Sequence, residues 1–378
     1  MKLLYKILKQ NPNTREGITI TTSALGIIVN TLLAVIKIIV GLAVGSIAII
    51  SEGANNASDS ATSLITIVGA KLSSKHPTKK HPFGFGRIEY LTSLLIAILI
   101  LVTAFELFMG SFKLIFTPIP LSISYITLFI IAISAIVKFV LGTYTIRMGK
   151  KVDSQSMIAV GTDCRNDAFI SAVTILSALL FLLFEISLDA YAGIVTSLFI
   201  LKTGYDVLRE TVSHLLGKPA GEDLVIKIYD EIKKVPCILG AADLMLHNYG
   251  PDSHTGSINL EIDHEKTIGD VYEAVHSLQL HILHEYGIVM VFGMYAVDSD
   301  HENVQIMRGK IAEFVDGYEH VIGFHALYLA PGTNEIYCDL VVDFELRDWD
   351  TLKKKFTEYM NHLYPNHQLV LTIETNYV

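Results

Sequence analysis

Residues 46–69 read SIAIISEGANNASDSATSLITIVG, an apolar stretch that is interrupted near its centre by polar and acidic side chains. A helix of about 20 mostly apolar residues is long enough to cross a bilayer. A carboxylate inside such a helix is costly and is therefore a candidate for function. Asn55 and Asp59 are one helical turn apart, which places them on the same face. This stretch predicts a membrane helix that carries part of a polar site.

A second stretch with the same spacing begins at residue 161 and reads GTDCRNDAFISAVTIL, with Asp163 and Asp167 on one face. If the two faces meet, three carboxylates and one amide converge on a point where a metal ion could bind. A simpler interpretation is that polar side chains only hydrogen-bond between helices, and we accept it for Asn56 and Asn166. It accounts poorly for three aspartates, because these need partners or protons.

The composition of the whole chain is that of a membrane protein. Of its 378 residues, 51% are hydrophobic and 18% are charged, and the mean hydropathy is +0.46. Six apolar stretches are long enough to span a bilayer: 18–43, 46–71, 88–116, 121–146, 155–184 and 188–210. They predict an all-α bundle of six transmembrane helices within residues 1–216. The first stretch is too long for a cleavable signal peptide, so we expect it to be retained.

Basic residues gather before the first apolar stretch and after the second and fourth stretches. They are Lys2, Lys6, Lys9, Arg15, Lys71, Lys75, Lys79, Lys80, Arg87, Arg147, Lys150 and Lys151. The other three connections contribute only Lys113 as a basic residue. Positive residues mark the cytoplasmic side of a membrane protein. We therefore expect a multi-pass protein of the cell membrane with both termini in the cytoplasm.

The tail, residues 219–378, holds 10 Lys and Arg against 26 Asp and Glu. This acidic balance argues against a nucleic-acid partner, which would require clustered basic residues. Two similar segments follow one another, from Val235 and from Tyr318, each with the pattern strand, strand, helix, strand after a leading helix. The expected helices are 222–234, 268–286, 302–316 and 349–363. The tail is predicted to be cytoplasmic and α+β, with two αββαβ domains at 217–300 and 301–378.

Sequence signatures of common enzymes are missing from the chain. We find no phosphate-binding loop, no GxSxG motif and no zincin helix. The three cysteines, Cys164, Cys237 and Cys338, form no CxxC pair, which argues against a structural zinc site and a disulfide framework. We therefore expect neither enzymatic activity nor a bound cofactor.

The stretch at 46–69, followed by HPFGFGRIEYL at 81–91, resembles the second helix and following loop of cation diffusion facilitators. GTDCRNDAFISAVTIL resembles their fifth helix, and LDAYAGIVTSLFILKTGY at 188–205 resembles their sixth. The resemblance covers residues 15–300 and implies a homodimer that exports divalent metal ions in exchange for protons. It also implies a ferredoxin-like cytoplasmic domain. The family's intramembrane metal site maps onto Asn55, Asp59, Asp163 and Asp167.

The residues at this site favour manganese as the transported ion. Zinc-transporting members typically carry His at one or both of the positions that hold Asn55 and Asp163 here. An all-oxygen site suits Mn²⁺ better than Zn²⁺, which prefers nitrogen and sulfur ligands. The pattern resembles the manganese-exporting branch of the family. A Zn²⁺, Fe²⁺ or Co²⁺ exporter on the same scaffold remains an alternative. A membrane-anchored metal sensor is an alternative of another class, against which the intramembrane aspartates argue.

The chain departs from the family at two further sites. The loop site keeps His81, but its other two positions hold Thr78 and Phe85, so we expect His81 to be structural or solvated. In the first tail repeat, Ala242 and Asn259 stand where the family has His, so we expect no metal site of the usual kind there. The second repeat has His325 in the matching position, either as a metal ligand or, as we favour, as a packed or solvated residue.

Several charged residues other than the aspartates fall within the apolar stretches. Glu52 is one turn from Asn55, and we expect it to help admit cations. Glu106 and Lys138 are expected to pair with each other or to line a cavity, with a proton-relay role open for Glu106. Lys202 is expected to extend toward the cytoplasm.

Overall fold

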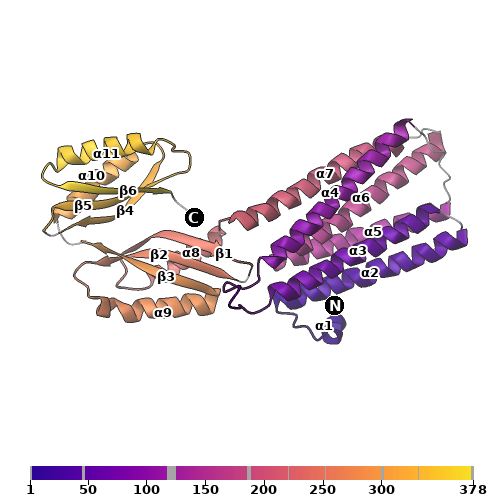
Figure 1. Cartoon of the computed structure of the whole chain (residues 1–378), viewed down its shortest axis with the longest axis horizontal. Coiled ribbons are helices and arrows are strands. Elements are labelled where there is room, and N and C mark those ends of the chain that lie inside the picture. Colours follow the sequence, from indigo (N-terminus) through magenta and orange to yellow (C-terminus); the bar gives the residue numbers. More distant parts are fainter. Residues whose placement is uncertain are drawn as a thin grey trace. The chain divides into compact units, whose positions relative to one another are not determined.

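The computed structural model describes residues 2–44, 47–116, 125–184, 189–219, 221–251, 253–298, 302–330 and 332–375. It divides into two units, which are residues 1–218 with 249–253, and residues 219–248 with 254–378 (Figure 1). The first unit is helical and the second contains both helices and strands. The boundary predicted within the tail, between 217–300 and 301–378, stays a prediction.

In its described residues, the first unit has one short and six long helices. They are α1 (Lys2–Ile7), α2 (Arg15–Val44), α3 (Ile47–Ser73), α4 (Ile88–Phe116), α5 (Tyr125–Lys151), α6 (Gln155–Phe184) and α7 (Asp189–Leu216). Each long helix covers one predicted apolar stretch; predicted residues 46, 121–124 and 188 lie outside the described part of the chain. Within that part, α2, α4 and α5 are long and apolar enough to cross a membrane. The unit is therefore a helical transmembrane domain with three clear apolar spans.

Three pairs of long helices lie side by side: α2 with α3, α5 with α6, and α4 with α7 (Figure 1). Glycines permit this close approach, as small residues commonly do between membrane helices. A Cβ added to Gly142 of α5 would lie 2.7 Å from the carbonyl oxygen of Gly161 on α6. A Cβ on Gly53 of α3 would lie 2.8 Å from Ile38 Cγ1 on α2. Gly53 and Gly161 each come two positions before a predicted site residue, so this packing helps to fix the position of the site.

The second unit contains two small sheets with the same element order. The first set is α8 (Glu222–Lys233), β1 (Gly240–Asn248), β2 (His254–Asp263), α9 (Ile268–Tyr286) and β3 (Ile288–Val297). The second set is α10 (Glu302–Asp316), β4 (Val321–Leu329), β5 (Glu335–Val342), α11 (Trp349–Leu363) and β6 (Gln368–Thr375). In each sheet the middle strand, β2 or β5, pairs antiparallel with the first strand and parallel with the third. The prediction of an α+β tail is confirmed.

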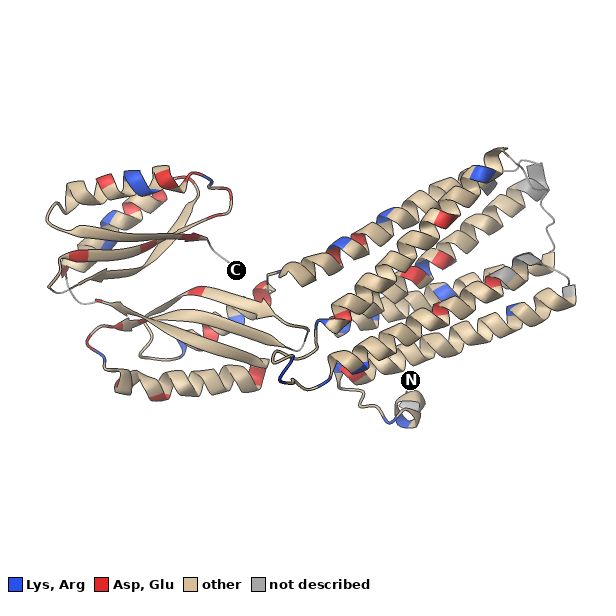
Figure 2. Cartoon of the chain, in the orientation of Figure 1, with Lys and Arg blue, Asp and Glu red and all other residues tan. Residues whose placement is uncertain are grey.

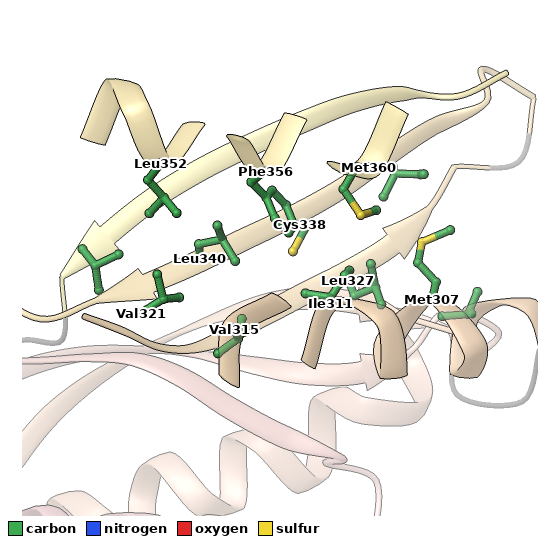
Figure 3. Packing of buried hydrophobic residues seen from close by; sticks show 13 residues of the cluster. Met307, Ile311, Val315, Val321, Leu327, Cys338, Leu340, Leu352, Phe356 and Met360 are labelled. Atoms are coloured by element: carbon green, nitrogen blue, oxygen red, sulfur yellow. The ribbon is translucent and has the colours of Figure 1, made fainter. Parts of the chain in front are cut away.

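The helices of each set cover one face of their sheet. In the second set, Leu352, Phe356 and Met360 recur every fourth residue of α11 and point toward the sheet (Figure 3). They pack with Cys338 and Leu340, which alternate with more exposed residues along β5. This alternation matches the two-residue period of a strand with one buried face. The opposite face of the sheet is therefore left for polar side chains.

Candidate metal centre

A cavity of about 650 Å³ lies inside the helical unit and is lined by residues of all six long helices. The four residues predicted to bind a metal ion all line it: Asn55 and Asp59 from α3, and Asp163 and Asp167 from α6. Glu52 and Glu106 line it as well. Figure 2 shows acidic and basic residues along the lengths of these helices as well as at their ends. The structure thus brings the two predicted pairs to one polar cavity.

The ammonium group of Lys138, on α5, lies between two carboxylates of this cavity. Its Nζ is 2.7 Å from Asp59 Oδ2 and 2.5 Å from Asp167 Oδ2. The residue is only 3% exposed. Of the two expectations for Lys138, pairing with Glu106 or lining the cavity, the structure shows the second, with the two aspartates as partners. The sequence could not reveal these partners, because they depend on which helices pack together.

A second buried lysine, Lys37 on α2, was overlooked in the sequence. Its Nζ is 2.9 Å from Glu52 Oε2, and the residue is 3% exposed. The signal was present, since Lys37 interrupts an apolar stretch in the same way as the aspartates do. Glu52 is therefore part of an ion pair at the cavity wall.

The three aspartates share the cavity but do not form a closed ligand group. Asp59 is buried, Asp163 and Asp167 are half-buried, and Asn55 is exposed. Among the described residues, the one group of three acidic, Cys or His side chains whose ligand atoms all lie within 4.8 Å of one another is in the tail. Carboxylates repel one another at short range. An ion coordinated by all four side chains would therefore require them to close around it.

Comparison with known proteins decides what kind of protein holds this cavity. Residues 23–216, more than half of the chain, match the family described as the cation efflux transmembrane domain. The chain belongs to the cation diffusion facilitator family. It is a membrane transporter for cations and not an enzyme. The resemblance seen in the sequence motifs is confirmed.

Three relatives show how far the likeness extends. An uncharacterized transporter of Methanocaldococcus jannaschii is 35% identical over 231 residues, which is 61% of this chain and 81% of that protein. The manganese efflux system protein MneS of Bacillus subtilis is 26% identical over 68% of this chain and 88% of its own length. The manganese efflux system protein MneP of the same organism is 25% identical over 73% of this chain and 94% of its own length.

In this cation diffusion facilitator, His81 lies in an exposed turn between α3 and α4. Its backbone N–H donates to the carbonyl of Thr78 and its carbonyl accepts from the Thr78 N–H, each at 3.0 Å. Its ring lies 4.7 Å from that of Phe85 between centroids. By the resemblance to the family, Thr78 and Phe85 are expected at the positions of the other two loop ligands, and a phenyl ring cannot coordinate a divalent ion. The described residues of this loop bring no acidic, Cys or His partner set to His81.

His325 lies in the tail unit, where it joins the two sheets of this cation diffusion facilitator. It is 8% exposed, and its Nε2 is 2.9 Å from Asp243 Oδ1 of β1. The same nitrogen is hydrogen-bonded to Glu374 of β6, and Nδ1 lies 3.9 Å from Asp339 Oδ2 of β5. His325 is buried, as a packed side chain would be, but it contacts carboxylates in addition to the ring of Tyr295, whose centroid lies 5.5 Å away.

Two β-bulges orient the side chains of Asp243 and His325. Asp243 has a φ of +59° at a break in the β1–β2 register. Ala326, next to His325, has a φ of +53° at a break in the β4–β5 register. Positive φ values are uncommon for non-glycine residues, and bulges redirect side chains locally. The bulges fall at matching positions of the two repeats, GAADL at 240–244 and GFHAL at 323–327.

The pKa shifts in this cluster follow from its hydrogen bonds. Burial alone would lower the pKa of His325, but bonds with Asp243 and Glu374 raise it from 6.5 to about 10. Burial would raise the pKa of Asp243, but bonds with His325 and Glu374 hold it well below its usual range. Burial also raises the pKa of Glu374. The cluster is thus an imidazolium held by carboxylates, and Asp243, His325 and Glu374 are close enough to hold a divalent ion instead.

The contact between the two sheets is expected to weaken as the pH rises. The raised pKa of His325 contributes stability that is complete below 6.5 and is lost as the pH rises through about 10. The lowered pKa of Asp243 contributes stability that is lost only when the pH falls below 3.8. His325→Ala leaves buried carboxylates unpaired, so it should lower the free energy of unfolding by about 3 kcal/mol near pH 6 and by less near pH 10.

Thermal unfolding of the full-length protein at the two pH values measures this effect. His284→Ala removes an exposed imidazole from α9 and serves as the matched control, with no change expected at either pH. A His325→Ala protein as stable as the parent near pH 6 would contradict the assigned ion pairs.

Proposed function

We propose that this protein exports Mn²⁺ from the cytoplasm across the cell membrane in exchange for protons. The observation that carries the proposal is the cavity among the six long helices, which Asn55, Asp59, Asp163 and Asp167 line together. Oxygen-bearing and acidic side chains inside a membrane domain mark pathways for ions or protons. Membership of a family of cation transporters supports the same function.

The donor atoms favour Mn²⁺ over Zn²⁺ at this cavity. Three carboxylates and an amide offer oxygen only, and oxygen ligands suit Mn²⁺. Zinc prefers nitrogen and sulfur in tetrahedral sites. Two of the relatives, MneS and MneP, are named as manganese efflux proteins, which supports the same ion for this chain.

Asn55→His tests the preference directly. The substitution puts an imidazole nitrogen where an amide stood, so the ratio of Zn²⁺ to Mn²⁺ transport should rise by about tenfold. The measurement is the initial rate of uptake of each ion into proteoliposomes. Asn55→Ala is the control, since it removes the amide without adding nitrogen and should slow both ions. Equal losses for both ions in Asn55→His would count against this role of the residue.

We propose that all six long helices cross the membrane, with both termini in the cytoplasm. Contacts of Arg15 support this topology. Its Nε donates to the carbonyl of Val152 at 2.7 Å and its guanidinium pairs with Glu89 at 2.5 Å. The start of α2, the start of α4 and the connection after α5 therefore lie at the same end of the bundle. These are the segments where the basic residues gather, as expected for a cytoplasmic end.

We also propose a fold for the tail and an oligomeric state for the protein. The αββαβ order of each half of the tail supports a ferredoxin-like fold in tandem. A homodimer is proposed on the resemblance to the family.

The proposed cycle follows from the chemistry of carboxylates. Asp59, Asp163 and Asp167 must be ionised to bind a metal ion, so binding and protonation exclude each other. The site would load from the cytoplasm, open outward by movement of helices around a fixed site, and release the ion as protons bind. Glu106, on the wall of the same cavity, is a candidate for relaying those protons.

Transport in proteoliposomes distinguishes this function from its rivals. An exporter moves Mn²⁺ across the bilayer and responds to a pH gradient. Flux of Zn²⁺ or Fe²⁺ in preference to Mn²⁺ would change the assigned ion and keep the scaffold. Binding of metal without turnover would favour a membrane-anchored sensor.

A further inference from the structure

Lys138 holds two of the oxygen atoms that the proposed metal site would use. Its Nζ lies 2.7 Å from Asp59 Oδ2 and 2.5 Å from Asp167 Oδ2, on helices α3 and α6. The other lysine of the cavity, Lys37, is held by Glu52 at 2.9 Å. Removal of one partner from a buried ion pair is strongly destabilising, because it leaves a buried charge unpaired. One of the two negative charges is already offset by a cation that belongs to the protein.

A divalent ion bound to Asp59 and Asp167 would lie close to this ammonium. Metal–oxygen bonds to carboxylates are roughly 2.0–2.6 Å long. An ion bound to the same two oxygens would therefore lie within a few ångström of Nζ. Two positive charges that close repel strongly where little water screens them. Binding of the ion requires the ammonium to leave, and return of the ammonium helps the ion to leave.

We propose that Lys138 is a tethered cation that competes with the transported ion for Asp59 and Asp167. This inference rests on the proposed function, because it takes those aspartates as ligands of the ion. The apparent affinity for metal is reduced by the fraction of time that the ammonium occupies the aspartates. Ions that coordinate carboxylates weakly, such as monovalent cations, cannot displace it. Lys138 thus acts as a specificity residue and as an aid to release on the outer side.

The same cavity contains a further carboxylate that can pair with the displaced ammonium. Glu106, from α4, lines the same cavity. Its carboxylate can receive the ammonium of Lys138 when the aspartates bind an ion. The flexible four-carbon stem of a lysine side chain allows such a change of partner.

Removal of the charge separates this role from a structural one. A purely structural ion pair, when broken, weakens metal binding and transport together. A competitor, when removed, tightens binding and slows release. In Lys138→Met, the Kd for Mn²⁺ should fall at least tenfold, and kcat should fall as well. Lys138→Arg keeps the charge, so its Kd should stay within about threefold of the parent value.

The experiment is equilibrium Mn²⁺ binding to the full-length protein, followed by paramagnetic resonance, with transport in proteoliposomes alongside. Lys202→Met is the matched control, because Lys202 is exposed on α7 and lies outside the cavity lining; its Kd should not change. Asp163→Ala distinguishes failure of the metal site from failure of the competition by Lys138. Unchanged binding in Asp163→Ala would overturn the proposed site itself.

Lost binding in Asp163→Ala with unchanged or weaker binding in Lys138→Met would overturn the tethered cation alone. Lys138→Gln is the second neutral variant, in case the methionine variant does not fold. Glu106→Gln gives a test in the opposite direction: loss of the second resting place should favour the ammonium at the aspartates and raise the Kd about threefold. If neither neutral variant folds, an unchanged Kd in Glu106→Gln overturns the proposal.

Discussion

Asp163→Ala is expected to abolish Mn²⁺ export while the protein stays folded. Asp163 lines the cavity and is half-buried, and Lys138 pairs with Asp59 and Asp167, so those ion pairs survive the substitution. The proposed site loses one of its three negative charges and one ligand. Even outer partners of metal ligands are worth about 10–100-fold in affinity, so loss of a ligand should reduce transport at subsaturating Mn²⁺ by about 100-fold or more. Initial rates of Mn²⁺ uptake into proteoliposomes measure this loss.

Asp206→Ala is the control for that experiment. Asp206 lies exposed on α7 and is not among the residues that line the cavity, so its loss should change the transport rate less than twofold. Transport at the parent rate in Asp163→Ala would remove this residue from the site. Equal losses in both variants would show a general effect of lost negative charge.

Gly161→Leu should strongly destabilise the helical unit. A Cβ at this position would meet Ile146 N at 2.8 Å and the carbonyl oxygen of Gly142 at 2.9 Å. Backbone atoms cannot relieve a clash by a change of rotamer as a side chain can, so α5 and α6 must move apart. Overpacking in a well-packed interior costs about 1–3 kcal/mol or more, and here it also pulls Lys138 away from Asp167. Detergent-solubilised protein should show a lower melting temperature or aggregate on size-exclusion chromatography.

Gly110→Leu provides the comparison for this packing effect. Gly110 also lies in a long helix, α4, but a Cβ built there meets no atom within 4 Å among the described residues. The same substitution should therefore leave the melting temperature nearly unchanged or raise it slightly, since leucine favours helix over glycine. A similar loss of stability in both variants would mean that the contact between α5 and α6 is not the cause.

Hydropathy alone placed the long helices, but it did not place all of their ends. The stretch predicted at 121–146 continues as helix α5 to Lys151, and the stretch predicted at 188–210 continues as α7 to Leu216. Apolar residues mark the part of a helix that needs lipid or a protein interior. Charged residues such as Arg147 can extend the same helix into water, because backbone hydrogen bonding does not depend on hydropathy.

The one-turn spacing of polar residues predicted side chains that share a cavity, but it did not predict their ion-pair partners. Asn55 with Asp59, and Asp163 with Asp167, line one cavity as their spacing suggested. Lys138 could not be assigned to two of them in advance, since the pairing of α5 with α6 is set by contacts such as that between Gly142 and Gly161 rather than by periodicity.

The tail shows the same limit of sequence reasoning. The repeat predicted two similar α+β halves, and the structure has two sheets with one element order. The partners of His325 come from β1 and β6, far apart in the chain. Local sequence does not specify how two sheets pack together. The orientation of the Asp243 carboxylate depends on a left-handed backbone conformation, which is usually predicted from a glycine, and this position has none.

The central claim, an ion-binding cavity in which metal and protons exchange, is tested most directly by simultaneous measurement of Mn²⁺ uptake and lumenal pH in proteoliposomes. We expect Mn²⁺ entry to be accompanied by proton movement in the opposite direction, and both to vanish in Asp163→Ala. Mn²⁺ uptake that is indifferent to an imposed pH gradient, or that persists in Asp163→Ala, would contradict it.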